Sequence, residues 1–243
     1  MNCQADTRCL LCDAVSPKLI LDLGETVLAN AFRRQEHLDV PEPRYPLRFG
    51  ACSECGHVQL LDRVSPSEMF RDYLYVSSAS ETLRSHFDEL SGLLVSRGGL
   101  GSNDLVVDIG CNDSLLLRCF DRRGLRTLGV DPAENLSEYS GNGIDRIVDF
   151  FGAGSAERIL DGWGTASLVT ITNTFPHIHD LDDFVIGLDG ILAPGGKIVI
   201  EAHYLVDMLE QTAFDTFYHE HVSYWRLGTI VRLFERHGMQ VVR

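Results

Sequence analysis

Apolar runs and amphipathic segments alternate through the second half of this 243-residue chain. The runs with the character of buried strands cover residues 105–110, 126–131, 167–174 and 197–204. Helical periodicity covers the stretches between them, at residues 114–124, 153–163 and 180–192. Strands that alternate with helices build parallel strand–helix–strand units and a doubly wound sheet. The pattern therefore predicts an α/β fold.

Four of the seven cysteines form two CxxC pairs, Cys9 with Cys12 and Cys52 with Cys55. Each CxxC turn places two thiolates on one side of a tight knuckle, and two knuckles complete a tetrahedral zinc site with Zn–S distances of roughly 2.3 Å. Four protein ligands leave no position for water, so this zinc would be structural and would staple a loop-rich segment. The odd number of cysteines argues against a disulfide framework. The alternatives are four free thiols or a redox dithiol.

The texture of the sequence changes twice along the chain. Residues 1–66 are short apolar pieces punctuated by Gly and Pro, and we predict that they form the zinc-binding domain. Residues 67–100 begin with a long amphipathic stretch, which predicts a helical connector. Residues 101–243 hold the alternating strands and helices, and are predicted to end with a helix over 226–238 and a strand over 239–243. The predicted organisation is a small zinc domain followed by a Rossmann-like domain.

The net charge of −14 argues against a nucleic-acid partner, because an acidic chain without a concentrated basic patch repels a phosphate backbone. No apolar run approaches the roughly 18 residues that a membrane-spanning helix needs. The N-terminal MNCQADTRCLLC lacks the basic end and apolar stretch of a secretion signal. We therefore expect a cytoplasmic protein whose partner is a small molecule, with no contact to membranes.

A glycine turn follows the first predicted strand, in 106-VVDIGCNDS-114. The carboxyl end of this strand in an open α/β sheet borders the ligand crevice, and a glycine there lets a ligand approach the backbone. Asp131 ends the next strand, where its carboxylate can accept hydrogen bonds from both hydroxyls of a ribose. GxGxxG, the fingerprint of pyrophosphate binding, is absent. This combination favours S-adenosylmethionine over NAD, the alternative being an ordinary turn without a ligand.

The candidate cofactor residues lie at the ends of successive predicted strands. They are Asp108, Gly110, Asn112 and Asp113 after the first strand, Asp131 and Pro132 after the second, and Asn173 and His177 after the third. The turn 194-PGG-196, between an apolar helix and a strand, is frequent in class I methyltransferases and supports the same interpretation.

Acid–base groups gather near the end of the chain, in 214-FDTFYHEHVSYW-225. Histidine has the unperturbed pKa closest to working pH, so His219 and His221 with Glu220 indicate proton transfer or metal binding. The metal interpretation is the weaker one, because the segment offers no third ligand and lacks HExxH spacing. A structural interpretation, with histidines at a helix end and aromatic rings in the core, also stays open.

Together these motifs resemble the sugar C-methyltransferases, which act on nucleotide-linked 4-keto-deoxysugars in antibiotic and cell-surface sugar pathways. The resembling segments follow the family's order and cover nearly the whole chain: the two CxxC pairs, 45-YPLRFGACSECGHVQL-60, 73-YLYVSSASETLRSHF-87, 107-VDIGCND-113, 173-NTFPHIHDL-181 and 214-FDTFYHEHVSYW-225. The resemblance implies a zinc-binding N-terminal domain, a class I fold that binds S-adenosylmethionine, and a further C-terminal domain.

The resemblance also implies the catalytic residues. In the family the second histidine of YHEH is the base, a role that falls here to His221, with Tyr218, Glu220 and Tyr73 or Tyr75 as neighbours. A carbon next to a ketone must lose a proton before it can take a methyl group, and a neutral imidazole can remove that proton. We therefore expect a transferase that methylates C3 of the sugar through an enolate. The alternatives are a non-catalytic binding module and methyl transfer to oxygen or nitrogen of another small molecule.

Three departures from the family pattern bear on these expectations. Ser114 stands where the family has the last glycine of IGCNDG. The family's AHIPDL is 176-PHIHDL-181 here, which brings Pro176 and His179 close to the expected methyl-transfer region. The chain also ends at Arg243, inside the expected last strand. We therefore expect a fragment, or a protein without the domain that helps hold the nucleotide end of the sugar.

Overall fold

The computed structural model describes residues 3–15, 17–139 and 143–242, which form two compact units. The first unit comprises Met1–Met69, Pro176–Leu181 and Ala202–Arg243. The second unit comprises Phe70–Phe175 and Asp182–Glu201. Each unit thus combines segments that are distant in the sequence. No helix within the described ranges has both the length and the hydropathy needed to cross a membrane.

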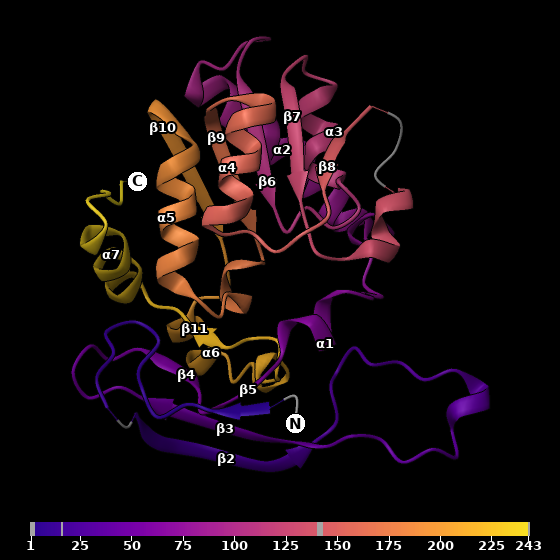
Figure 1. Ribbon diagram of the computed structural model, residues 1–243, viewed down its shortest axis with the longest axis vertical. Coiled ribbons are helices and arrows are strands. Elements are labelled where there is room, and N and C mark those ends of the chain that lie inside the picture. Colours follow the sequence, from indigo (N-terminus) through magenta and orange to yellow (C-terminus); the bar gives the residue numbers. More distant parts are fainter. Residues whose placement is uncertain (1–2, 16, 140–142, 243) are drawn as a thin grey trace. The chain divides into compact units, whose positions relative to one another are not determined.

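The second unit is built on a five-stranded parallel sheet with the order β10-β9-β6-β7-β8 (Figure 1). Its strands are β6 (Leu105–Ile109), β7 (Arg126–Val130), β8 (Asp145–Ile147), β9 (Ala166–Thr172) and β10 (Leu192–Glu201). All positions of β6 are buried, as in a parallel strand that is covered on both faces. The strand order reverses at β6, so the carboxyl end of this strand is where open α/β sheets bind ligands.

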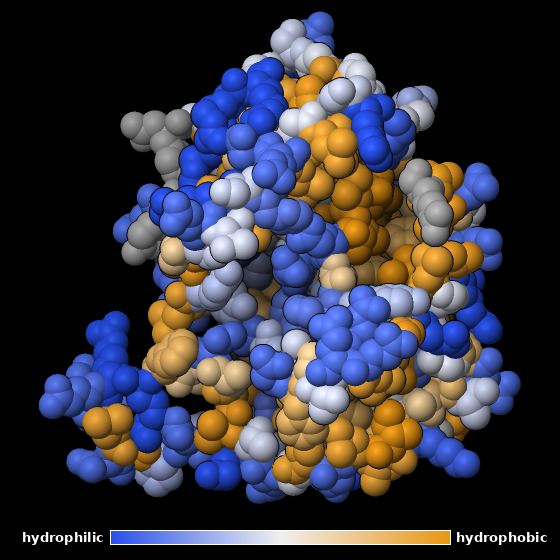
Figure 2. All heavy atoms as spheres, turned by 180° about the vertical axis from the view of Figure 1, so that it is seen from behind, coloured by the Kyte–Doolittle hydropathy of each residue, from blue (hydrophilic) through white to orange (hydrophobic). Residues whose placement is uncertain are grey.

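Helices cover both faces of this sheet. They are α2 (Glu81–Gly98), α3 (Leu115–Asp121), α4 (Ala153–Trp163) and α5 (Leu181–Ile191), with the 3-10 helices η2 (Ser77–Ala79), η3 (Glu134–Tyr139) and η4 (Phe175–His177). Figure 1 shows α4 and α5 in front of the sheet and α2 and α3 behind it. Hydrophilic residues are interspersed among hydrophobic ones on the surface seen from behind, as expected for helices that bury one side (Figure 2).

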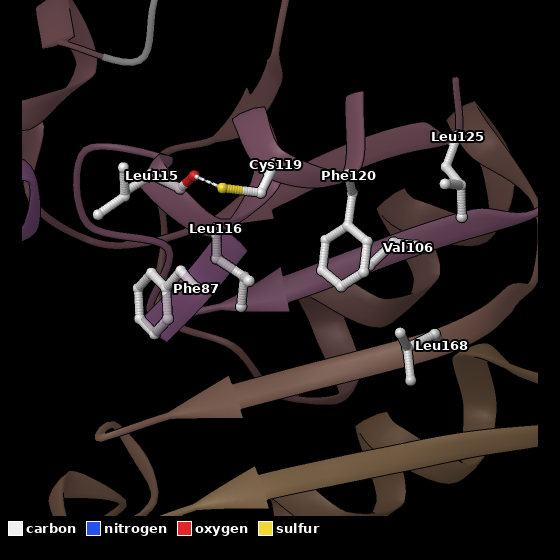
Figure 3. Packing of buried hydrophobic residues seen from close by; sticks show 8 residues of the cluster. All are labelled: Phe87, Val106, Leu115, Leu116, Cys119, Phe120, Leu125 and Leu168. Atoms are coloured by element: carbon white, nitrogen blue, oxygen red, sulfur yellow. Dashed lines mark hydrogen bonds between the residues drawn. The ribbon is translucent and has the colours of Figure 1, made fainter. Parts of the chain in front are cut away.

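A hydrophobic cluster joins α2 and α3 to the sheet. Phe87 of α2 and Leu116 and Phe120 of α3 pack with Val106 of β6 and Leu168 of β9 (Figure 3). The boundaries of α2 have local causes. The Ser80 hydroxyl accepts a hydrogen bond from the backbone N–H of Leu83 at its start, and Gly99 ends it in the left-handed conformation.

The first unit is built on an antiparallel sheet with the order β11-β4-β3-β2, and it also contains the pair β1–β5. Its strands are β1 (Cys3–Ala5), β2 (Lys18–Thr26), β3 (Tyr45–Ala51), β4 (Val58–Leu60), β5 (Asp62–Val64) and β11 (Ser223–Tyr224). Its helices are α1 (Pro66–Phe70), α6 (Leu205–Glu210) and α7 (Leu227–Arg236), with η1 (Gln35–His37) and η5 (Phe214–Thr216).

The end of the chain completes the core of the first unit. Ser223 and Tyr224 of β11 pair with Gln59 and Val58 of β4. The core that results unites the early side chains Leu47, Phe49 and Leu60 with the late ones Leu205, Met208, Val222 and Tyr224. This composition differs from the predicted division into residues 1–66, 67–100 and 101–243, because the periodicity of a sequence reports local structure and not which distant segments share a core.

Most predicted elements of the second unit are confirmed. The strands over 105–110, 126–131 and 167–174 correspond to β6, β7 and β9, and the helices between the predicted strands correspond to α3, α4 and α5. The predicted helix over 226–238 corresponds to α7, which belongs to the first unit. The doubly wound α/β fold is therefore present.

Three local predictions were wrong or incomplete. The strand expected over 197–204 begins earlier, so that β10 includes 194-PGG-196 with a register shift between Leu192 and Lys197, and it ends at Glu201. Residues 239–242 form no strand, because no described strand pairs with them; Arg243 lies outside the described residues. In the predicted connector, residues 71–76 are not helical.

Candidate functional site

Four thiols meet in the first unit. The Sγ atoms of Cys9, Cys12, Cys52 and Cys55 all lie within 4.8 Å of one another. The Cys9–Cys55 and Cys12–Cys52 Sγ–Sγ distances are both 3.6 Å. Tetrahedral zinc with Zn–S bonds of roughly 2.3 Å holds its sulfurs roughly 3.8 Å apart. The four cysteines therefore fit zinc, in a closed site that would be structural.

The two cysteine knuckles share one backbone arrangement. The N–H groups of Asp13 and Gly56 donate to the carbonyls of Cys9 and Cys52 at 3.0 and 2.9 Å. Both donors have a positive φ, 58° and 70°, a conformation that glycine and Asx residues tolerate best. At position 56 a Cβ would lie 2.2 Å from Arg226 Nη2, so a larger residue would have to displace the end of this arginine side chain.

The glycine of the turn in the second unit has a packing cause that the sequence did not predict, in addition to the predicted approach of a ligand. Gly110 ends β6 with φ of 73°, and a Cβ there would lie 1.9 Å from Oγ1 of Thr174. Packing against Thr174 therefore requires glycine, whether or not a ligand approaches. Asn112 and Ser114 also have positive φ, 51° and 62°, so Ser114 occupies a left-handed position in which glycine would be less strained.

Two buried carboxyl groups lie at the ends of β6 and β7. Asp108 accepts a hydrogen bond of 2.6 Å from the Thr170 hydroxyl, and burial raises the pKa of Asp108 to about 7, with Asp131 adding to the shift. Burial also raises the pKa of Asp131. Asp131 Oδ2 accepts from the Asn112 N–H at 2.8 Å, and Oδ1 lies 3.2 Å from Arg146 Nη2. Asp131 thus braces the turn, in addition to its predicted role as a ribose acceptor.

Asp113 supplies the test of whether S-adenosylmethionine fits this turn. It is 1% exposed, and its Oδ1 has no hydrogen-bond partner within the described ranges. Its other oxygen lies 3.2 Å from Arg118 Nη2. A buried acceptor without a donor, in the turn that follows β6, suits a cationic ligand that carries hydroxyl and amine donors, and would repel a pyrophosphate.

The other predicted cofactor residues divide between the two units. Pro132 is partly exposed beside Asp131. Asn173 is exposed in the second unit, with φ of 58° and a backbone N–H that donates to the carbonyl of Glu201 at 2.7 Å. His177, by contrast, belongs to the first unit, where it lies beside His221.

Tyr73 and Tyr75 lie in the unit that carries the glycine turn. The side chain of Asn112 donates to the Tyr75 carbonyl at 2.9 Å and accepts from the Ser77 N–H at 2.9 Å. Tyr73 exchanges backbone hydrogen bonds with the Asn135 side chain. The Tyr75 side chain is 49% exposed. Asn112 therefore holds the segment around Tyr75 against the glycine turn, whereas Tyr218, Glu220 and His221 belong to the first unit.

The geometry of His221 defines its tautomer. Its Nδ1 lies 2.9 Å from the carbonyl oxygen of Thr216, and a carbonyl only accepts, so Nδ1 carries the proton. The lone pair is then on Nε2, 3.1 Å from the hydroxyl of Tyr218, which donates to it. The ring is 3% exposed. His221 therefore presents a single basic atom, Nε2.

Three rings lie nearer to His221 than that of Tyr224, whose centroid is 6.3 Å away. The centroids of His177, His203 and Tyr218 lie 5.1, 5.0 and 4.4 Å from that of His221. We call His177, His203 and His221 the histidine cluster. Burial lowers the pKa of His221 to about 3, and His177 and His203 add to the shift, so this imidazole is neutral at neutral pH. Burial raises the pKa of Tyr218, which keeps its hydroxyl protonated.

Glu220 and His219 have different surroundings from His221. Glu220 is 3% exposed, and its Oε1 accepts a hydrogen bond of 2.6 Å from the Asn30 side chain. Its backbone carbonyl accepts from Nδ1 of His177 at 2.8 Å. His219 points to β3, where its Nε2 lies 3.3 Å from the carbonyl of Tyr45. The sequence segment YHEH thus supplies one histidine to the cluster and one to the packing of the sheet.

The sequence interpretation missed Asn30, Arg146 and His203. Asn30 and Arg146 carry no signal in the sequence, since their roles depend on distant partners. His203 fell within a predicted strand, although a histidine at a strand's carboxyl end is a signal that could have drawn attention to it.

Comparison with known proteins agrees with this architecture. Residues 75–243 match the family described as "Methyltransferase domain". The chain belongs to the methyltransferase domain family. Residues 9–70 match the family described as "Putative zinc binding domain". The predicted class I fold, its dependence on S-adenosylmethionine and the N-terminal zinc-binding domain with its four cysteines are confirmed at the level of the family.

A curated relative shows which kind of methyltransferase this chain is similar to. The C-methyltransferase NovU of Streptomyces niveus is 37% identical over 224 residues, which cover 92% of this chain and 53% of that protein. The chain thus spans about half the length of this relative. The resemblance to C-methyltransferases is confirmed at this level.

Two solved structures are also similar. A SAM dependent methyltransferase from Archaeoglobus fulgidus has a TM-score of 0.49 and 16% identity, covering 63% of this chain and 68% of its own. An O-methyltransferase family protein from Burkholderia thailandensis has a TM-score of 0.46 and 16% identity, covering 68% of this chain and 57% of its own.

Proposed function

We propose that this chain transfers the methyl group of S-adenosylmethionine to C3 of a nucleotide-linked 4-keto-deoxysugar, with His221 as the base. The observation that carries the proposal is the tautomer of His221, whose Nδ1–H donates to the Thr216 carbonyl and whose Nε2 holds the lone pair, facing the Tyr218 hydroxyl. The similarity to a protein named C-methyltransferase supports carbon as the acceptor.

His221 Nε2 would remove the C3 proton, and the electron pair of the C–H bond would pass into an enolate. An imidazole with a pKa of about 3 is a weak base, so its cation must be stabilised as it forms. The negative charge that develops on the enolate beside the ring supplies this stabilisation in a buried site. Because Nε2 faces the Tyr218 hydroxyl, the substrate must displace that hydrogen bond.

Tyr218 has the properties of the enolate's hydrogen-bond donor. Its raised pKa keeps the proton on the hydroxyl, and the hydroxyl already points to the ring that takes the C3 proton. Once released from Nε2, it can donate to the ketone oxygen as negative charge develops there. Glu220, held by Asn30, would orient the surrounding groups.

The second unit would hold the methyl donor. Asp108, Asp113 and Asp131 are its candidate partners, because carboxyl groups accept from hydroxyl and amine donors and favour a cation. Bound S-adenosylmethionine supplies an electrophilic methyl group. In this proposal the first unit supplies the base, and the second unit supplies the candidate partners of the methyl donor.

Proton exchange tests the proposal directly. The full chain is incubated in D₂O with a nucleoside-diphosphate-linked 4-keto-6-deoxyhexose, and loss of the C3 proton is followed by NMR. Adding S-adenosylmethionine with a ¹³C-labelled methyl group then reports the new carbon–carbon bond. We expect His221→Ala to slow exchange by about 10²–10⁴-fold. His37→Gln, at an exposed histidine in η1, is the matched control.

Each alternative function predicts a different result. Unchanged exchange in His221→Ala would remove His221 as the base. Methyl transfer without C3 exchange would indicate an oxygen or nitrogen acceptor. No heat on titrating zinc-loaded protein with S-adenosylmethionine would support a non-catalytic binding module.

A further inference from the structure

His203 lies on the solvent side of the histidine cluster. Its ring is tilted 48° to that of His221, with the centroids 5.0 Å apart. His203 is exposed, whereas His221 is buried and His177 lies between these extremes. In the part of the chain that the structure describes, no hydrogen bond engages the His203 ring, so water can reach its nitrogens, and the nitrogen that carries no proton can accept one.

A buried base must lose its proton before it can act again. The Thr216 carbonyl holds Nδ1–H of His221 and cannot keep a second proton. The Tyr218 hydroxyl is already protonated, since burial raises its pKa. His177 has one nitrogen committed to the Glu220 carbonyl at 2.8 Å and is less exposed than His203. Among the rings that touch His221, His203 therefore has the best access to both the base and the solvent.

We propose that His203 discharges His221, passing the substrate's proton from Nε2 to solvent; this inference rests on the proposed function. The C3 proton moves to Nε2 of His221, and its electron pair remains in the enolate. The enolate carbon then bonds to the methyl group, whose carbon–sulfur bond breaks and leaves a neutral thioether. The proton moves from Nε2 through one water to a ring nitrogen of His203, and then to bulk water.

Single-turnover and steady-state rates separate this role from a structural one. A first turnover starts from neutral His221 and needs no discharge, whereas every later turnover does. In His203→Gln we expect the steady-state rate and the D₂O exchange to fall about tenfold, a part of what general acid–base catalysis contributes. The single-turnover rate with enzyme in excess should stay at the level of the wild type and of the His37→Gln control.

Chemical rescue sharpens the test. In His203→Ala, imidazole added to the buffer should restore the steady-state rate, because the position is exposed. A single-turnover rate that falls as much as the steady-state rate, or a failure of imidazole to restore turnover, would overturn the inference. So would a steady-state loss in His177→Gln with none in His203→Gln.

A measurement without substrate keeps the two proposals separate. If the wild type neither exchanges nor methylates the ketosugar, the proposed function fails. The proton path is then tested on ¹⁵N-histidine-labelled protein, by the rate at which the His221 imidazole exchanges its protons with water. We expect this rate to fall about tenfold in His203→Gln and to stay unchanged in His37→Gln. An unchanged rate in His203→Gln would overturn the discharge role.

Discussion

Asp108, at the glycine turn of the second unit, and His221, in the histidine cluster of the first unit, are both buried and titratable, yet burial shifts their pKa values in opposite directions. It raises the pKa of Asp108 to about 7 and lowers the pKa of His221 to about 3. In each case the neutral form is favoured, since a charge is costly in a medium of low polarity. The Asp108 carboxyl group can donate or accept a hydrogen bond near neutral pH, and the neutral imidazole of His221 can accept a proton.

The two regions also differ in how they are assembled. The turn follows a strand within one contiguous segment and needs no metal. The histidine cluster joins residues 176–181 to residues 202–225, in a unit whose loops are held by the four cysteines. The histidine cluster should therefore be more sensitive than the glycine turn to the loss of contacts between segments that are distant in the sequence.

Metal removal should have the largest effect. Chelation, or Cys52→Ser, should unfold the first unit, because structural zinc contributes about 10–16 kcal/mol in zinc-finger peptides. The parallel sheet of the second unit should persist. Amide hydrogen exchange resolved by NMR measures this, with Cys3→Ser, which lies outside the four-thiol group, as control. Full protection of β4 and β11 after chelation would contradict the prediction.

Gly110→Ala should destabilise the second unit by about 2–5 kcal/mol, through the clash with Thr174 and the positive φ. Urea unfolding of ligand-free protein measures it. Adding Thr174→Ala should recover the part due to the clash. Gly190→Ala in α5, where a Cβ meets nothing within 4 Å, is the control and should be neutral or stabilising. A fully stable Gly110→Ala would show that packing does not require this glycine.

The two units should respond to pH with opposite signs. Burial lowers the pKa of His221 and His179 from 6.5 to about 3. Between these pH values the two histidines are protonated in the unfolded chain and neutral in the folded first unit. The first unit should lose stability as pH falls from about 6.5 to 3. Burial raises the pKa of Asp108 from 3.8 to about 7, so the folded second unit keeps a proton that the unfolded chain releases. Its stability should fall as pH rises from about 4 to 7.

Unfolding of each unit, followed by hydrogen exchange at several pH values, tests these signs. His221→Gln should flatten the dependence of the first unit, and Asp108→Asn that of the second. If the stability of both units changed in the same direction with pH, burial would not be the cause of the pH dependence.

The smallest expected effect comes from a pair of amide side chains. Asn30→Ala removes the hydrogen bond to Glu220 and should cost the first unit about 1 kcal/mol. Asn135→Ala removes the two bonds to the Tyr73 backbone and should cost the second unit a similar amount. Thermal unfolding of each variant, resolved by unit, should show two separate losses. If Asn30→Ala lowered the stability of the second unit instead of the first, the assignment of these two hydrogen bonds to separate units would be wrong.

The predictions from sequence succeeded where the physical cause is local. The strands β6, β7 and β9 follow from apolar runs, and the cysteine knuckles follow from a spacing that itself defines a turn. Short β8 escaped prediction, because three residues carry too little pattern. The reason given for Gly110 was also incomplete, since Thr174, the side chain that requires the glycine, comes from the end of another strand.

By itself the sequence determined the parallel sheet and the two CxxC motifs that bring four cysteines together. It also determined that histidine, glutamate and tyrosine are concentrated around His221. Only the tertiary structure decided which nitrogen of His221 is basic, that His203 lies beside it, and that β11 completes a sheet begun by the N-terminal residues. The physical reason is that periodicity and turn chemistry act between near neighbours in the chain. Burial, tautomers and contacts between rings arise only when distant segments share one core.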